Sequence, residues 1–117
     1  MNNAQVIQVI KGRMGPVRGM TTYNNMLYVV YNAQSHVDVY KLSDFTKSHQ
    51  IKVDGMKYPD SLVSCEYYKC LYISDLENCI IHRIQLNDNN KISTWSIRGL
   101  STGSFQFLKI SFMIKLL

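Results

Sequence analysis

Asp75, Glu77 and Asn78 are the residues whose types and spacing could most readily do chemistry in this chain. They lie inside the stretch Leu71–Ile84, which reads LYISDLENCIIHRI. An apolar run, a polar segment and a second apolar run predict two strands joined by a loop. A calcium ion would need more converging oxygens than these side chains offer. We therefore expect Asp75 and Asn78 to brace the loop by bonding backbone N–H groups rather than to bind a ligand.

The three histidines do not have the spacing of metal ligands. His36, His49 and His82 lie far apart in the sequence, whereas zinc ligands from one segment are usually a few residues apart. An internal repeat aligns His82 with Asp38 in the middle of a strand, so we expect His82 to face the surface. No GxSxG nucleophile elbow is present. The sequence predicts no catalytic residue, no metal ligand and no cofactor site, and we expect the protein not to be an enzyme.

The three cysteines indicate a reducing environment. Cys65, Cys70 and Cys79 form an odd set without CxxC spacing, which does not match a zinc site. Buried free thiols in a reducing compartment account for them most simply. Cys65 and Cys70 could also face each other across a hairpin, so a disulfide between them stays an alternative.

Composition fits one folded domain in the cytoplasm. The chain has 117 residues, 46% of them apolar, and a formal charge of +5 whose basic residues are scattered rather than clustered. Scattered charge is weak support for nucleic-acid binding. The N-terminus lacks the pattern of a signal peptide. The apolar run from Phe105 to Leu117 is too short to span a bilayer.

Short runs rich in Val, Ile and Tyr predict strands along the whole chain. Asn24-Asn25 can adopt the left-handed conformation of a two-residue turn, so we expect a hairpin there. No window has a sustained apolar face at helical spacing, and the predicted class is all-β. The predicted strands of the first part are Gln5–Lys11, Val17–Tyr23, Met26–Tyr31, Val37–Tyr40 and His49–Val53.

The chain repeats itself at an offset of 44 positions. Residues 23–56 then align without a gap with residues 67–100, placing Tyr23 on Tyr67 and Leu27 on Leu71. Two units of about forty residues, each with four strands, are typical of propeller blades. The predicted fold is an incomplete propeller of two four-stranded antiparallel blades and a preceding strand. Its predicted parts are a closing strand and loop (1–16), blade 1 (17–56), blade 2 (57–100) and an apolar tail (101–117).

The segment Leu71–Asp75, with Asn78 and Ile81 after it, resembles the NHL repeat. In that family of six-bladed propellers, a strand ending in Tyr-Val-Ala-Asp is followed by an Asn and an Ile-rich strand. The first unit matches less well, because Tyr31 replaces the Asp and Gln34 replaces the Asn. Its loop chemistry should therefore differ. The resemblance implies a docking surface for protein or RNA, and no enzyme activity.

Two units cannot close a ring, because a propeller needs at least four blades. We therefore expect a piece of a longer protein, a truncated gene product, or a subunit that completes its propeller by self-assembly. In such blades one rim gathers the loops that enter the inner strands and the loops between the middle strands. The predicted interaction rim consists of Arg13, Arg18, Lys57, Tyr58, Asp75 and Asn78.

The leading hypothesis is a noncatalytic module that binds a protein partner through this rim. The alternative is RNA binding by the basic loop residues, with Tyr58 beside Lys57 as a stacking candidate. A fragment of a six-bladed hydrolase or lactonase is a third reading, for which the sequence shows no carboxylate cluster. We interpret Trp95 as an apolar contact between blades. Tyr67 and Tyr68 are likewise expected to pack within strands.

Overall fold

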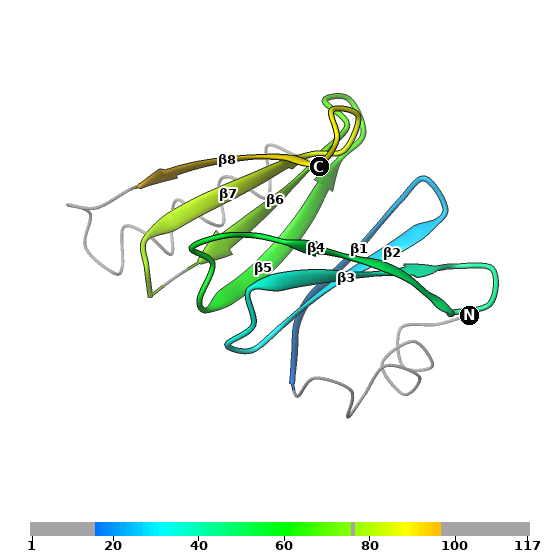
Figure 1. Cartoon of the computed structure of the whole chain (residues 1–117), viewed down its shortest axis with the longest axis horizontal. Coiled ribbons are helices and arrows are strands. Elements are labelled where there is room, and N and C mark those ends of the chain that lie inside the picture. Colours follow the sequence, from blue (N-terminus) through cyan, green and yellow to red (C-terminus); the bar gives the residue numbers. More distant parts are fainter. Residues whose placement is uncertain (1–15, 76, 97–117) are drawn as a thin grey trace.

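The computed structural model describes residues 16–75 and 77–96, which form two four-stranded antiparallel sheets (Figure 1). The described residues contain no helix, so the all-β prediction is confirmed for them. The predicted strand Gln5–Lys11, Arg13 and the tail 101–117 lie outside the described residues. The first sheet has the order β1 (Val17–Tyr23), β2 (Met26–Tyr31), β3 (His36–Lys41) and β4 (Lys47–Lys52). The second has the order β5 (Pro59–Cys65), β6 (Cys70–Asp75), β7 (Ile80–Gln85) and β8 (Lys91–Ser96).

The first hairpin forms at the predicted turn. Tyr23 pairs with Met26, and the two residues between them, Asn24 and Asn25, have φ angles of 50° and 63°. Two consecutive residues with positive φ define the type I′ turn, whose twist matches that of paired strands. Asparagine tolerates this conformation better than most residues because its short polar side chain bonds locally. The sequence Asn-Asn therefore sets the register of β1 on β2.

The second hairpin differs, and it corrects the gapless repeat. Cys65 pairs with Cys70, so four residues form the turn. Strands β6, β7 and β8 begin 44 positions after β2, β3 and β4, but β5 ends only 42 positions after β1. Tyr23 therefore corresponds to Cys65, and its alignment with Tyr67 was wrong. The turn is two residues longer in the second unit, which a comparison without gaps cannot accommodate.

The main core lies between the two sheets. Alternate residues of β2 and β3 point toward the second sheet and meet alternate residues of β6 and β7. Fully burying one such aliphatic side chain contributes about 1.5–3 kcal/mol. The members of this core are Tyr28, Val30, Val37, Val39, Ile51, Val53, Met56, Leu62, Leu71, Ile73 and Ile84. Because this cluster draws on both units, the two sheets form one packed body.

Strands β1 and β5 approach each other closely because β1 carries a glycine. A Cβ added to Gly19 would lie 2.9 Å from the backbone nitrogen of Leu62 and 3.2 Å from a methyl of Val30. A hydrogen-bonded pair of hydroxyls, Thr21 and Ser64, also joins the two strands at 3.0 Å. The first strands of neighbouring sheets therefore touch, as the converging inner strands of a propeller do.

The opposite face of the first sheet is also apolar. Leu27, Val29, Tyr31 and Tyr40 form a second buried cluster there. Strands buried on both faces read as continuous apolar runs rather than as alternating ones, which explains the sequence MLYVVY of β2. Stacked sheets with two apolar faces are typical of repeat architectures, whose units pack on neighbours on either side.

Three aromatic residues do not lie where the sequence predicted. Tyr67 and Tyr68 are 84% and 60% exposed because they belong to the four-residue turn rather than to a strand. Trp95 is 42% exposed, whereas Ile51, its counterpart in β4, is 5% exposed. The second sheet covers Ile51, and Trp95 lies on the face of the second sheet that points away from the first. Its ring packs edge-on against Tyr72 instead, with the centroids 6.4 Å apart.

Candidate interaction rim

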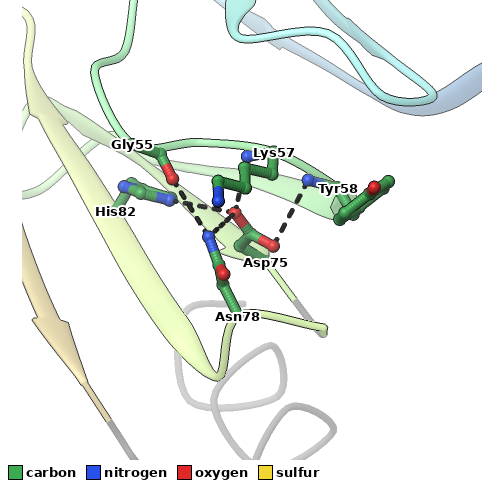
Figure 2. A network of polar contacts seen from close by, with 6 residues as sticks. All are labelled: Gly55, Lys57, Tyr58, Asp75, Asn78 and His82. Atoms are coloured by element: carbon green, nitrogen blue, oxygen red, sulfur yellow. Dashed lines mark hydrogen bonds and ion pairs between the residues drawn. The ribbon is translucent and has the colours of Figure 1, made fainter.

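The candidate site lies where the linker between β4 and β5 meets the ends of β2 and β6. Asp75, the last residue of β6, holds this linker in place (Figure 2). Its Oδ2 accepts a hydrogen bond from the backbone N–H of Lys57 at 2.8 Å, and its Oδ1 accepts one from Tyr58 at 3.3 Å. The carboxylate is fully buried. One buried side chain therefore fixes the backbone of the two residues that enter the second sheet.

Asn78 completes this brace. Its side-chain amide donates to the backbone carbonyl of Gly55 at 3.1 Å and to Oδ2 of Asp75 at 3.3 Å. Gly55 has a φ of +85°, a conformation that other residues adopt only with strain. The expectation that Asp75 and Asn78 brace the loop is confirmed by these contacts. The loop they brace includes the linker before β5 as well as their own turn.

His82 is buried next to the brace, which corrects the prediction of a surface position. It is 1% exposed, and its Nε2 lies 3.5 Å from Oδ2 of Asp75. His82 pairs with Ile73, and the alternation of β7 points it toward the first sheet together with Ile84. Neither ring nitrogen has a hydrogen-bond partner among the described residues. The repeat had correctly aligned His82 with Asp38, but Asp38 is buried as well.

The surroundings keep Asp75 ionised. Burial alone would raise the pKa of its carboxyl group, but the interaction with His82 and the backbone N–H groups of Lys57 and Tyr58 outweigh burial. The pKa of Asp75 is therefore lower than usual. A carboxylate that accepts several hydrogen bonds in this way is stabilised in its charged form. At neutral pH the brace is built around a buried negative charge.

Beside the brace, the surface forms an open hollow of about 170 Å³. Arg18 borders it, and the Nε of this arginine donates to Oδ1 of Asn32 at 3.3 Å. Tyr58 is 43% exposed and contributes its ring, and Lys57 is exposed next to it. The residues lining the hollow are Arg18, Asn32, Tyr58, Pro59, Asp60 and Glu77. The hollow thus carries one cation, two carboxylates, an amide and an aromatic ring.

The structure therefore divides the predicted rim into two roles. Arg18 and Tyr58 line the hollow and Lys57 adjoins it, so these three can contact a partner. Asp75 is buried and only positions its neighbours, and Asn78 is half-buried and does the same. Arg13 lies outside the described residues. Sequence reasoning missed the lining residues Asn32, Asp60 and Glu77. Asn32 and Glu77 lie in loops that the repeat assigns to this rim, and Asp60 is the second residue of β5.

The corresponding place in the first sheet has different chemistry, as the sequence indicated. Tyr31 replaces Asp75, and its hydroxyl lies 3.2 Å from that of Tyr40. Asp38 replaces His82, with the ammonium of Lys47 at 3.3 Å and Nε2 of His36 at 3.4 Å. Burial, together with the hydrogen bond to Tyr40, raises the pKa of Tyr31 well above its usual range. Tyr31 is therefore neutral, and among the described residues, which begin only at Pro16, it forms no counterpart of the Asp75 brace.

The described residues contain neither a cluster of metal-ligating side chains nor a membrane-spanning helix. No group of three or more His, Cys, Asp or Glu side chains in residues 16–75 and 77–96 is arranged to hold a metal ion. Within the same residues, no helix is long and apolar enough to cross a membrane.

Comparison with known proteins identifies the fold. The chain is similar to a solved structure described as the crystal structure of RRP9 WD40 repeats, with a TM-score of 0.58 and 10% identity over 68% of this chain and 24% of that one. It is also similar to Hsv2 of Kluyvelomyces marxianus, with a TM-score of 0.50 and 12% identity over 62% of this chain and 25% of that one. No family model and no curated protein matches the sequence. The chain thus spans about a quarter of these propeller structures, and it has the fold of a partial β-propeller.

Proposed function

We propose that this chain is a noncatalytic propeller module of the NHL-like type that binds a protein partner through the rim formed by Arg18, Lys57 and Tyr58. The observation that carries the proposal is the brace of Asp75, which fixes the backbone of Lys57 and Tyr58 beside the hollow. A contact surface whose backbone is already ordered loses less entropy on binding. Exposed tyrosine and arginine are also the residue types that most often dominate protein interfaces.

The mixed charge of the hollow favours protein over RNA. Asp60 and Glu77 line it together with Arg18, and carboxylates would repel the phosphates of a nucleic acid. A protein surface offers groups of both signs and can complement such a site. RNA binding would instead be recognised by a steep loss of affinity with salt, and replacing Arg18 and Lys57 would then flatten that dependence.

The proposal is tested by placing a photo-crosslinking amino acid at position 58 of the full chain. A matched variant carries it at position 67, in the exposed turn between β5 and β6 at the other end of the strands. Proteins joined at position 58 but not at 67 are identified and purified, and their binding is then measured. Replacing Arg18, Lys57 and Tyr58 together by alanine should weaken binding at least tenfold. Equal capture at both positions, or unchanged affinity of the triple variant, contradicts the proposal.

The NHL-like type and the division into blades belong to the same proposal. The place of Asp75 and Asn78 after β6 supports the type, and the eight strands fall four each within residues 17–56 and 57–100. The lack of a disulfide at Cys65 and Cys70 supports a cytoplasmic location. Self-assembly is tested by sedimentation: a particle heavier than the 13.5 kDa chain would support it, and a strictly monomeric one would argue against it.

A further inference from the structure

Cys65 and Cys70 face each other at the base of the turn between β5 and β6. They are directly opposed partners in the antiparallel register of these strands. Opposed residues in such a pair have Cα atoms about 4.5–5.5 Å apart, which falls within the range of about 4.4–6.8 Å found in disulfides. The backbone therefore already holds the two cysteines at a separation that a disulfide requires.

Both thiols are free and buried in this structure. Burial raises the pKa of the Cys70 thiol, and the neighbouring Cys65 adds to this effect, while Tyr72 and Arg83 oppose it. The two side chains lie on the same face of the sheet, because directly opposed residues of paired strands do so. Since the thiolate is the reactive form, Cys70 should react slowly at neutral pH and faster in mild alkali.

We propose that Cys65 and Cys70 form a cross-strand dithiol site that reacts with a low-molecular-weight disulfide, such as glutathione disulfide, and closes to an intramolecular disulfide. One thiolate attacks the glutathione disulfide and releases one glutathione. The second thiolate attacks the resulting mixed disulfide and releases another. The two cysteines lose two electrons, the glutathione disulfide gains them, and the two thiol protons end on the released glutathione molecules.

The disulfide would close a small ring around an exposed aromatic turn. Tyr67 and Tyr68 pack edge to face there, with ring centroids 4.8 Å apart. Gln85 already braces this turn by donating to the carbonyl of Tyr68 at 2.6 Å. A bond between Cys65 and Cys70 would hold the ends of the turn covalently. The turn lies at the opposite ends of β5 and β6 from Lys57 and Tyr58, so this site is independent of the proposed interaction rim.

The test treats the full chain with glutathione disulfide at mildly alkaline pH and counts the remaining thiols. The chain has three cysteines, so the count should fall from three to one, with a loss of two hydrogens in the intact mass. The disulfide is mapped in a Cys79→Ser variant, because trypsin leaves Cys79 and Cys70 in one peptide. Cleavage after Lys69 separates Cys65 from Cys70, and the two peptides should stay joined until a reductant is added.

Single variants provide the controls. Cys65→Ser and Cys70→Ser should each accept glutathione as a stable adduct without losing two hydrogens, whereas Cys79→Ser should close the ring as the natural chain does. The closed form should also melt at a higher temperature than the reduced form, because the bond constrains the unfolded chain. Stable glutathione adducts in the natural chain, a bond that involves Cys79, or three unreacted thiols would each overturn the proposal.

Discussion

The two sheets share a strand order and a repeat, but they differ at the last residue of the second strand, which is buried in both. In the second sheet Asp75 ends β6 and accepts hydrogen bonds from the linker and from Asn78, and Nε2 of His82 lies 3.5 Å from it. In the first sheet Tyr31 ends β2, and its hydroxyl lies 3.2 Å from that of Tyr40. A carboxylate can accept several hydrogen bonds, whereas a phenol offers one donor and a weaker acceptor. The second sheet therefore carries the brace that orders the linker before β5.

The two sheets also differ in the position of their buried carboxylates, Asp75 and Asp38. The charge of Asp75 is balanced by backbone N–H groups and a histidine at the rim. The charge of Asp38 lies in mid-strand, and neither of its oxygens has a hydrogen bond among the described residues, although Lys47 is 3.3 Å away. Buried charges are tolerated when they are paired and hydrogen-bonded. Asp38 is paired with a charged group but lacks hydrogen bonds within that part of the chain. We therefore expect the second sheet to lose more stability than the first when its carboxylate is removed.

Replacing Asp75 by alanine should have the largest effect. The change leaves the backbone N–H groups of Lys57 and Tyr58 without their acceptor and leaves the amide of Asn78 with Gly55 alone. Breaking a buried charged network of this kind costs about 3–5 kcal/mol. Urea unfolding measures the loss. The matched control is Asp44→Ala, which removes an exposed carboxylate bonded to Thr46 and should cost far less stability, because surface substitutions usually have small effects. Equal losses in the two variants would contradict the special role of Asp75.

Replacing Gly19 by alanine should destabilise the contact between the sheets by about 1–3 kcal/mol, the usual cost of overpacking. The new methyl would meet the backbone of Leu62 at 2.9 Å, and a backbone atom cannot move aside as a flexible side chain can. Thermal unfolding measures the effect. Alanine at Gly55 is a useful contrast, because nothing lies within 4 Å and only its φ of +85° opposes the change. A Gly19→Ala variant as stable as the natural chain would show that β1 and β5 are less closely packed.

Replacing Tyr31 by phenylalanine should cost about 1 kcal/mol, the net value of one hydrogen bond. The ring and its packing remain, and the bond between the hydroxyls of Tyr31 and Tyr40 is lost together with the interaction of the Tyr31 hydroxyl with Asp38. Equilibrium unfolding of the variant measures this against Asp75→Ala, its counterpart in the second sheet. If the two variants lost similar stability, the proposed difference between the sheets would be wrong.

The repeat was visible in the sequence because apolar residues keep their phase along β2, β3 and β4 and along β6, β7 and β8. The turn Asn24-Asn25 could also be predicted, since local chemistry decides it. The burial of His82 could not be predicted in this way. It depends on which face of β7 meets the other sheet, and a polar residue gives no hydrophobic signal of its own. The exposure of Tyr67 was missed because a turn of two extra residues breaks the phase.

The rim was predicted as a set of neighbouring loops, but the sequence could not assign its roles. Asp75 and Lys57 both read as polar loop residues, yet one is fully buried and the other is exposed. The difference arises from a contact between residues 18 positions apart. Such a contact follows from the packing of the linker over the end of β6, which only the folded chain reveals.

The smallest effect expected is a pH dependence of stability that arises from Asp75 in the second sheet. The pKa of Asp75 is lowered in the folded chain. The folded state therefore stabilises the ionised carboxylate relative to the unfolded state. A carboxyl group of this kind stabilises the fold above its unfolded pKa of about 3.9, and the contribution disappears as the pH falls through its lower folded pKa. Stability measured by urea unfolding should therefore decline from about pH 5 toward about pH 3.

The decline should be shallower in Asp75→Asn, which keeps one acceptor but cannot ionise, and should be unchanged in Tyr31→Phe. An equally steep decline in Asp75→Asn would assign the acid sensitivity to other carboxylates. Asp44 is one of them, because its hydrogen bonds to Thr46 also lower its pKa.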